Sequence, residues 1–208
     1  MKRLLLTFVI LSFGIRHSAS AAVIYSGVQN IAIPTGFTGI YLNLDNAATG
    51  TSPITGWDIN PFFGGAGVAN SAAFQPARLA SGNLDPALRL NVGDVVGAAL
   101  TYSSGFGGFG GSGDPIAHLG SAANQFQVGS EAYMGFRFNT DASTGPFYGW
   151  IRVAFTNNTS GGVIKDWAYD DTGSAITIES VPEPSRALLL GLGLTGLLLR
   201  RKRNHGGL

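Results

Sequence analysis

Four acidic residues stand in or beside segments expected to be loops between strands: Asp45, Asp141, Asp170 and Asp171. Oxygen-rich loops of this kind bind Ca²⁺ in many extracellular β-domains, although the chain has no EF-hand pattern. The same residues also form ordinary Asx turns or stay solvated. The sequence therefore requires no cofactor, and these four carboxylates are the candidates if a Ca²⁺ site exists.

Catalytic chemistry has little support in the chain. It contains no Cys, and His118 is the only His between the terminal segments, with no Gly-x-Ser-x-Gly turn to accompany it. Gly105–Gly110 matches Gly-x-Gly-x-x-Gly in form, but Gly111–Pro115 cannot begin the helix that phosphate binding needs. Paired carboxylates could hydrolyse glycosides, yet no motif selects two of the acids. We predict no catalytic residues, with an extracellular polysaccharide hydrolase as the alternative.

The charge distribution argues against nucleic acid as a partner. The whole chain has a formal net charge of +1. Residues 22–180 hold five basic and eleven acidic side chains, a balance of about −6. A domain that attracts a polyanion through its overall charge has the opposite sign.

The elements that must position these side chains are strands. Polar and apolar residues alternate in Ile40–Asp45 and Tyr133–Asn139, which indicates half-buried strands. Only Ala72–Ala80 shows a weak helical period. Further strands are expected at 23–28, 95–102, 147–156, 163–169 and 174–179, separated by Gly, Pro, Asn and Asp clusters. The pattern predicts an all-β, antiparallel two-sheet sandwich of jelly-roll type, with a closed barrel as the rival.

Trp150 and Trp167 fall within two of the expected strands. Each has a large apolar area to bury and a ring N–H that needs a partner, so we predict that both anchor the core. The alternative is a sugar-binding surface of exposed aromatic rings.

The N-terminus has the features of a secretory signal peptide. Lys2 and Arg3 precede an apolar run, and Ala19 and Ala21 are the small residues that signal peptidase recognises. The run is shorter than the roughly 20 residues of a membrane span. We predict cleavage near Ala21 or Ala22 and export through the inner membrane.

The C-terminus ends in an apolar segment and a basic cluster. Ala187–Leu199 is an uncharged run of 13 residues, flanked by Arg186 and by Arg200, Arg201, Lys202 and Arg203. As a helix it would be about 20 Å long, against a hydrocarbon core of roughly 30 Å. Snorkelling of the flanking arginines makes it a marginal transmembrane helix, with the basic end in the cytoplasm.

Directly before this segment stands Val181-Pro182-Glu183-Pro184-Ser185. The order Pro-Glu-Pro, apolar helix, basic cluster resembles the PEP-CTERM sorting signal of exopolysaccharide-producing Gram-negative bacteria, although residues 204–208 extend past the usual basic end. The resemblance implies processing at the motif by a membrane-embedded exosortase. The prolines keep the motif extended, as a protease needs, and cleavage would leave the mature protein without a span.

A second resemblance lies in residues 135–169. Gly135–Phe138, Tyr148–Val153 and Ile164–Tyr169 are similar to a strand series in ectodomains that have PEP-CTERM tails. This implies a shared β-sandwich scaffold and no particular chemistry.

Together these observations predict three segments: a signal peptide at 1–21, a β-sandwich ectodomain at 22–180 and a PEP-CTERM sorting segment at 181–208. The expected protein is exported to the cell envelope or to the extracellular matrix of a biofilm, with a structural or binding role. Its expected partners are signal peptidase, exosortase, the inner membrane at least transiently and, as a candidate ligand, exopolysaccharide. Besides the hydrolase, a surface- or ice-binding adhesin is an alternative, although the chain lacks the regular Thr-x-Thr ladder of a flat ice-binding face.

Overall fold

The computed structural model describes residues 23–82, 85–104, 119–156 and 161–179. This part of the chain is all-β and every strand pair is antiparallel; its only helical element is the short 3-10 turn η1 (Phe63–Gly65). The prediction of an all-β, antiparallel fold is confirmed.

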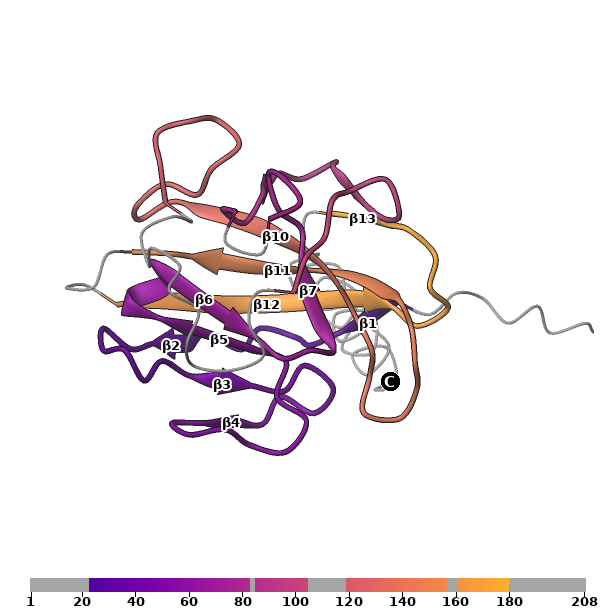
Figure 1. Ribbon diagram of the computed structural model, residues 1–208, viewed down its shortest axis with the longest axis horizontal. Coiled ribbons are helices and arrows are strands. Elements are labelled where there is room, and N and C mark those ends of the chain that lie inside the picture. The colour runs from indigo at the N-terminus through magenta and orange to yellow at the C-terminus, as the bar shows by residue number, and fades with distance from the viewer. Residues whose placement is uncertain (1–22, 83–84, 105–118, 157–160, 180–208) are drawn as a thin grey trace, which may run out of the picture.

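The largest sheet is built around a meander of three long strands (Figure 1). Two short strands pair with one edge of the meander, along β12, and two with the other edge, along β10. The strands are β10 (Glu131–Phe138), β11 (Phe147–Ala154), β12 (Gly162–Asp170), β1 (Val23–Tyr25), β2 (Ile31–Ile33), β7 (Phe74–Pro76) and β8 (Arg89–Leu90).

Two smaller sheets cover the faces of the largest one. One has the order β4-β3-β5-β6, and the other pairs β9 with β13. On one face Met134, Ile151 and Trp167 pack in a cluster with Leu42 and Ile59 of the first small sheet. On the other face a second cluster joins the meander to β9 and β13. The strands are β3 (Tyr41–Leu42), β4 (Thr49–Gly50), β5 (Ile59–Phe62), β6 (Gly67–Asn70), β9 (Val95–Val96) and β13 (Ile176–Thr177).

The weak helical period at Ala72–Ala80 does not correspond to a helix. Residues 74–76 form β7 instead, antiparallel to β10. Pro76 has no backbone N–H and would disrupt a helix interior. Phe74 is fully buried and stacks on Phe136 of β10, with ring centroids 4.9 Å apart. Tertiary packing therefore decides the structure of this segment.

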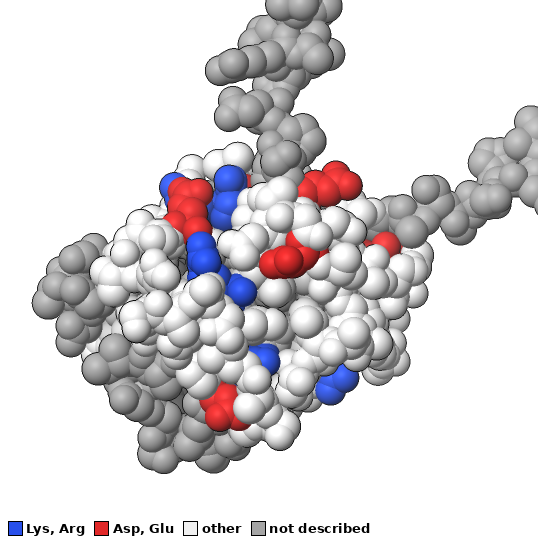
Figure 2. Space-filling view, turned by 90° about the horizontal axis from the view of Figure 1, so that it is seen from above, with Lys and Arg blue, Asp and Glu red and all other residues white. Residues whose placement is uncertain are grey.

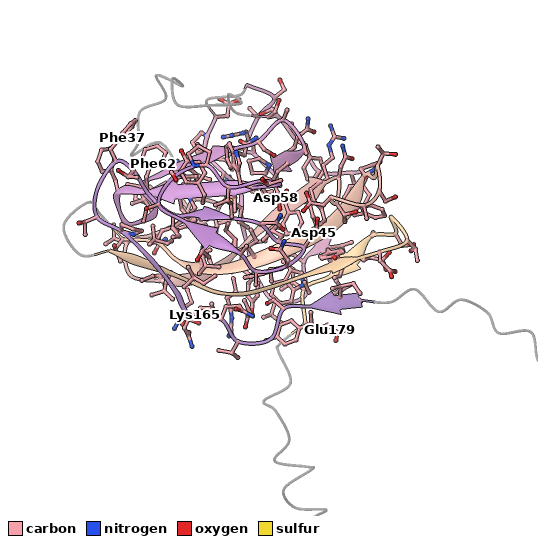
Figure 3. All side chains as sticks on the ribbon, turned by 90° about the horizontal axis from the view of Figure 1, so that it is seen from below. Phe37, Asp45, Asp58, Phe62, Lys165 and Glu179 are labelled. Atoms are coloured by element: carbon pink, nitrogen blue, oxygen red, sulfur yellow. The ribbon has the colours of Figure 1, made fainter. Side chains whose placement is uncertain are left out.

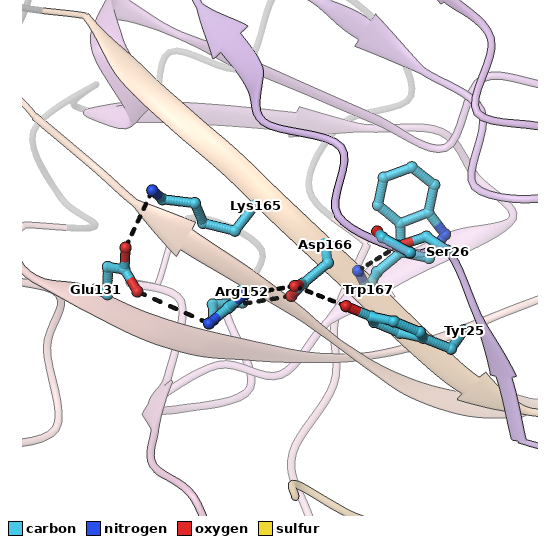
Figure 4. A network of polar contacts seen from close by, with 8 residues as sticks. Tyr25, Ser26, Glu131, Arg152, Lys165, Asp166 and Trp167 are labelled. Atoms are coloured by element: carbon cyan, nitrogen blue, oxygen red, sulfur yellow. Dashed lines mark hydrogen bonds and ion pairs between the residues drawn. The ribbon is translucent and has the colours of Figure 1, made fainter. Parts of the chain in front are cut away.

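An extra residue in β12 breaks the strict alternation of its side chains. The register with β11 shifts after Arg152, as at a β-bulge. As a result Ile164 and Trp167 both enter the core cluster, while Lys165 and Asp166 both lie on the opposite face (Figure 4).

That opposite face holds a charged network (Figure 4). Asp166 has a fully buried side chain and accepts hydrogen bonds from Arg152 Nε and from the Tyr25 hydroxyl, both at 3.0 Å. Lys165 pairs with Glu131 at 3.1 Å. Burial and the neighbouring Asp166 charge raise the pKa of Tyr25 to about 12. The charge of the buried Asp166 carboxylate is thus balanced by the guanidinium of Arg152. We interpret the network as one that holds the strands together.

Candidate functional site

Asp45 and Asp141 come together from two different loops, one after β3 and the other between β10 and β11. The backbone N–H of Asp141 donates to Asp45 Oδ2 at 2.5 Å. Asn43 connects the two loops, because its Nδ2 donates to Asp141 Oδ2 at 2.8 Å and its Oδ1 accepts from the Asp45 N–H at 2.8 Å. Two of the four predicted Ca²⁺ candidates are therefore neighbours.

A third carboxyl group, Asp58, lies against this pair and was not singled out from the sequence. It directly precedes β5 and is only 3% exposed; Figure 3 shows it beside Asp45. Its Oδ2 accepts a hydrogen bond from the Leu44 N–H at 2.8 Å. Burial raises the pKa of Asp58 to about 7, and the negative charges of the neighbouring Asp45 and Asp141 also raise this pKa.

Asp45 is itself poorly solvated. Its Oδ1 atom is buried and has no hydrogen-bond partner in the described part of the chain. Burial is the main cause that raises the pKa of Asp45, and the Asp141 charge adds to it. Gly56 has a positive φ of 69°, and a Cβ there would collide with the Asp141 carboxylate and the Asn43 amide. We call Asp45, Asp58 and Asp141 the acidic cluster.

Asp170 and Asp171 lie at the end of β12, and Asp170 has a local role. Its Oδ1 accepts from the backbone N–H groups of Thr172 at 2.8 Å and Ser174 at 3.1 Å, and from the Thr172 hydroxyl. Burial by itself raises the pKa of Asp170, but these hydrogen bonds outweigh it and lower the pKa overall. Asp170 thus stabilises its own turn, as the Asx-turn alternative describes.

Among the described residues, no group of three or more His, Cys, Asp or Glu side chains is placed to hold a metal ion. Because Asp45, Asp141 and Asp170 accept hydrogen bonds within the protein, we expect melting temperatures in roughly 5 mM Ca²⁺, a concentration that covers weak extracellular sites, and in EDTA to agree closely. A rise of about 5 °C or more in Ca²⁺, which is over 1 kcal/mol for a domain of this size, would contradict this expectation. Loss of that rise in Asp141→Asn, but not in Asp94→Asn, would then locate Ca²⁺ at the acidic cluster.

Both predicted tryptophan anchors are buried, at 4% exposure for Trp150 and 2% for Trp167. Trp150 makes an edge-to-face contact with Tyr133. Trp167 Nε1 donates to the Leu44 carbonyl at 3.0 Å and so links the two facing sheets. The core prediction is confirmed, and neither ring is available as a sugar-binding surface.

The remaining predicted sites lie outside the described residues. These are His118 and the glycine-rich segment, Ala19 and Ala21 of the leader, the Val181–Ser185 motif, and the flanking basic residues Arg186, Arg200, Arg201, Lys202 and Arg203. Within the described ranges no helix is long and apolar enough to cross a membrane.

Figure 2 shows one face, on which basic and acidic side chains are interspersed among uncharged ones without an extended patch of one sign.

Comparison of the chain with protein-family models, with curated proteins and with solved structures gave no significant match. The described part of the chain is by its structure an all-β domain of antiparallel sheets.

Proposed function

We propose that this protein is exported to the cell envelope or extracellular matrix, where its jelly-roll-like β-sandwich ectodomain has a structural or binding role and a PEP-CTERM tail directs its sorting. The observation that carries the proposal is the ordered set of signals in the sequence: a leader at 1–21, then Pro182-Glu183-Pro184, the apolar run 187–199 and the basic end.

The position of the folded part supports the proposal. The first described strand, β1, starts at Val23, directly after the expected cleavage site, and the last described residue, Glu179, lies three positions before Pro182. Both processing sites would then lie at the edges of the β-domain, where cleavage leaves its core intact.

We further propose that the protein is not an enzyme. The carboxyl groups of the acidic cluster hydrogen bond to backbone and amide groups of one another's loops. That arrangement suits loop attachment better than a pair of catalytic acids on either side of a substrate.

Intact-mass measurement and cell fractionation in an exosortase-containing host test the sorting proposal. We expect a mature chain without residues 1–21 or 1–22 and without 187–208, found outside the inner membrane. In a strain without exosortase, and in the double variant Pro182→Ala/Pro184→Ala, we expect the tail to remain and the protein to stay with the inner membrane.

A wild-type mass that still includes 187–208 in the exosortase-containing host would contradict tail cleavage and leave a retained membrane anchor. A mass that still includes the leader would contradict export by signal peptidase. The variant Ala19→Arg, which blocks signal-peptidase recognition, provides the reference mass for an uncleaved leader.

A further inference from the structure

A hollow of about 240 Å³ lies beside β7, where β10 leads into the loop toward β11. Its polar residues are Gln75, Arg137 and Asn139, and its apolar lining includes Ala73 and Pro146. The acidic cluster does not contribute to this lining.

Arg137 is held on two sides in this hollow. Its Nε donates to Gln75 Oε1 at 2.6 Å, and its guanidinium carbon lies 5.0 Å from the ring centroid of Tyr102, which is a cation–π contact. The described ranges place no carboxylate within ion-pair distance of Arg137, whereas Arg152 and Lys165 have acidic partners. A guanidinium that lines the hollow and is held by these two contacts is suited to an anionic ligand.

The two amide side chains add donors rather than acceptors. Gln75 Oε1 accepts from Arg137, and Asn139 Oδ1 accepts from the Gly145 N–H at 2.9 Å. Because both partners are donors, the orientation of each amide is fixed, and its NH₂ group remains for other contacts. The polar lining therefore offers guanidinium and amide donors around a small apolar surface.

We propose that this hollow binds one uronate unit of an acidic polysaccharide. A carboxylate matches the planar guanidinium fork, and the amide NH₂ groups can donate to the ring hydroxyls next to it. The volume lies below the roughly 300–1,000 Å³ of ordinary ligand pockets, which favours a single sugar ring. The inference rests on the proposed extracellular role, because that role supplies a polysaccharide, and it specifies the ligand class.

The net charge of the domain bears on how an anionic sugar would bind. Residues 22–180 have a balance of about −6, so long-range attraction does not favour an anion. Binding must come from direct contacts in the hollow and should require both the carboxylate and the sugar ring.

Isothermal titration of the full-length chain tests the proposal, in a polyoxyethylene detergent whose headgroup contains no sugar. We expect sodium glucuronate to bind at least about tenfold more tightly than glucose or acetate, the loss expected when a charge-assisted hydrogen bond is absent. Equal binding of acetate would show a carboxylate site without sugar recognition, and preferential binding of poly-glutamate would show an acidic-peptide site. Either result, or no binding of glucuronate, would overturn the proposal.

Two near-isosteric variants separate binding from folding. Asn139→Asp keeps an acceptor for the Gly145 N–H, and Gln75→Glu keeps one for Arg137 Nε and adds an ion pair. We expect both to weaken glucuronate binding about tenfold or more while Gln75→Glu melts at the same or a higher temperature than wild type. Arg89→Gln, outside the hollow, should bind as wild type does.

Unchanged glucuronate binding in both acidic variants would exclude the hollow as the site. The outcome is independent of sorting: a correctly processed protein that does not bind glucuronate overturns this inference alone, and an unprocessed protein that binds it overturns only the sorting proposal.

Discussion

Trp167→Ala should lower the free energy of unfolding by about 3–5 kcal/mol, the usual range for truncation of a fully buried Trp. The ring is 2% exposed and lies in the cluster between the two facing sheets. Its removal also leaves the Leu44 carbonyl without the 3.0 Å hydrogen bond from Nε1, which adds the cost of a buried unsatisfied acceptor. Chemical unfolding monitored by circular dichroism measures the loss.

Two matched substitutions divide that loss into its parts. Trp167→Phe keeps most of the apolar area but removes the ring N–H, so we expect it to cost clearly less than Trp167→Ala. Trp57→Ala makes the same truncation at a half-buried ring, which packs edge-to-face against Tyr41 at 5.0 Å, and should also cost less. A Trp167→Ala loss below about 1 kcal/mol, typical of surface substitutions, would contradict the role of this residue as the link between the sheets.

The three strands of the meander could be predicted because each is a run of eight or nine residues rich in aromatic and aliphatic side chains. Such a run has one face that must be buried, and each long strand pairs with its neighbour in the chain. The β12 bulge is the exception. In Ile164-Lys165-Asp166-Trp167 the two apolar residues are three apart, and only the extra residue brings both to the same face.

Strands β5 and β6 were not predicted because their apolar pattern is short and interrupted. Each has only four residues, Pro61 interrupts β5, and the glycines around η1 dilute the apolar pattern between them. The position of β5 is set by the sheet: the N–H of Ile40, directly before β3, donates to the Pro61 carbonyl of β5 at 3.1 Å.

The acidic cluster could be predicted only in part from the sequence. The loop positions of Asp45 and Asp141 marked them as candidates, but Asp58 stands alone between Trp57 and Ile59. It reaches the pair because its N–H donates to the Leu42 carbonyl at 2.8 Å as β5 pairs with β3. Long-range strand pairing therefore determines which carboxyl group is buried, and no local pattern records it.

The burial of Asp58 should make the stability of the protein fall as the pH rises from about 4 to about 7. The pKa of Asp58 is about 7 in the folded protein against an ordinary value of 3.8. A carboxyl group with a raised folded-state pKa favours folding in its protonated form. Its contribution is complete below the unfolded pKa, declines as the pH rises above about 4, and is lost once the pH passes the folded pKa. A pKa difference of this size corresponds to a change of about 4 kcal/mol in the free energy of unfolding between low and high pH.

Asp58→Asn should therefore stabilise the protein at pH 8 and change it little at pH 4. The amide keeps an acceptor for the Leu44 N–H but has no charge to bury beside Asp45 and Asp141. Unfolding free energies of wild type and variant, measured from pH 4 to 8, should diverge with increasing pH by up to about 4 kcal/mol.

Asp94→Asn is the matched control, since Asp94 Oδ2 accepts a comparable backbone hydrogen bond from Asn91 at 2.7 Å in an exposed setting. The amide there removes no buried charge, so its effect should stay small and nearly the same at both ends of the pH range. If Asp58→Asn destabilises the protein at pH 8, or shifts stability equally at pH 4 and pH 8, burial does not raise the pKa of Asp58. Hydrogen bonds alone would then have to stabilise the charged carboxylates of the acidic cluster.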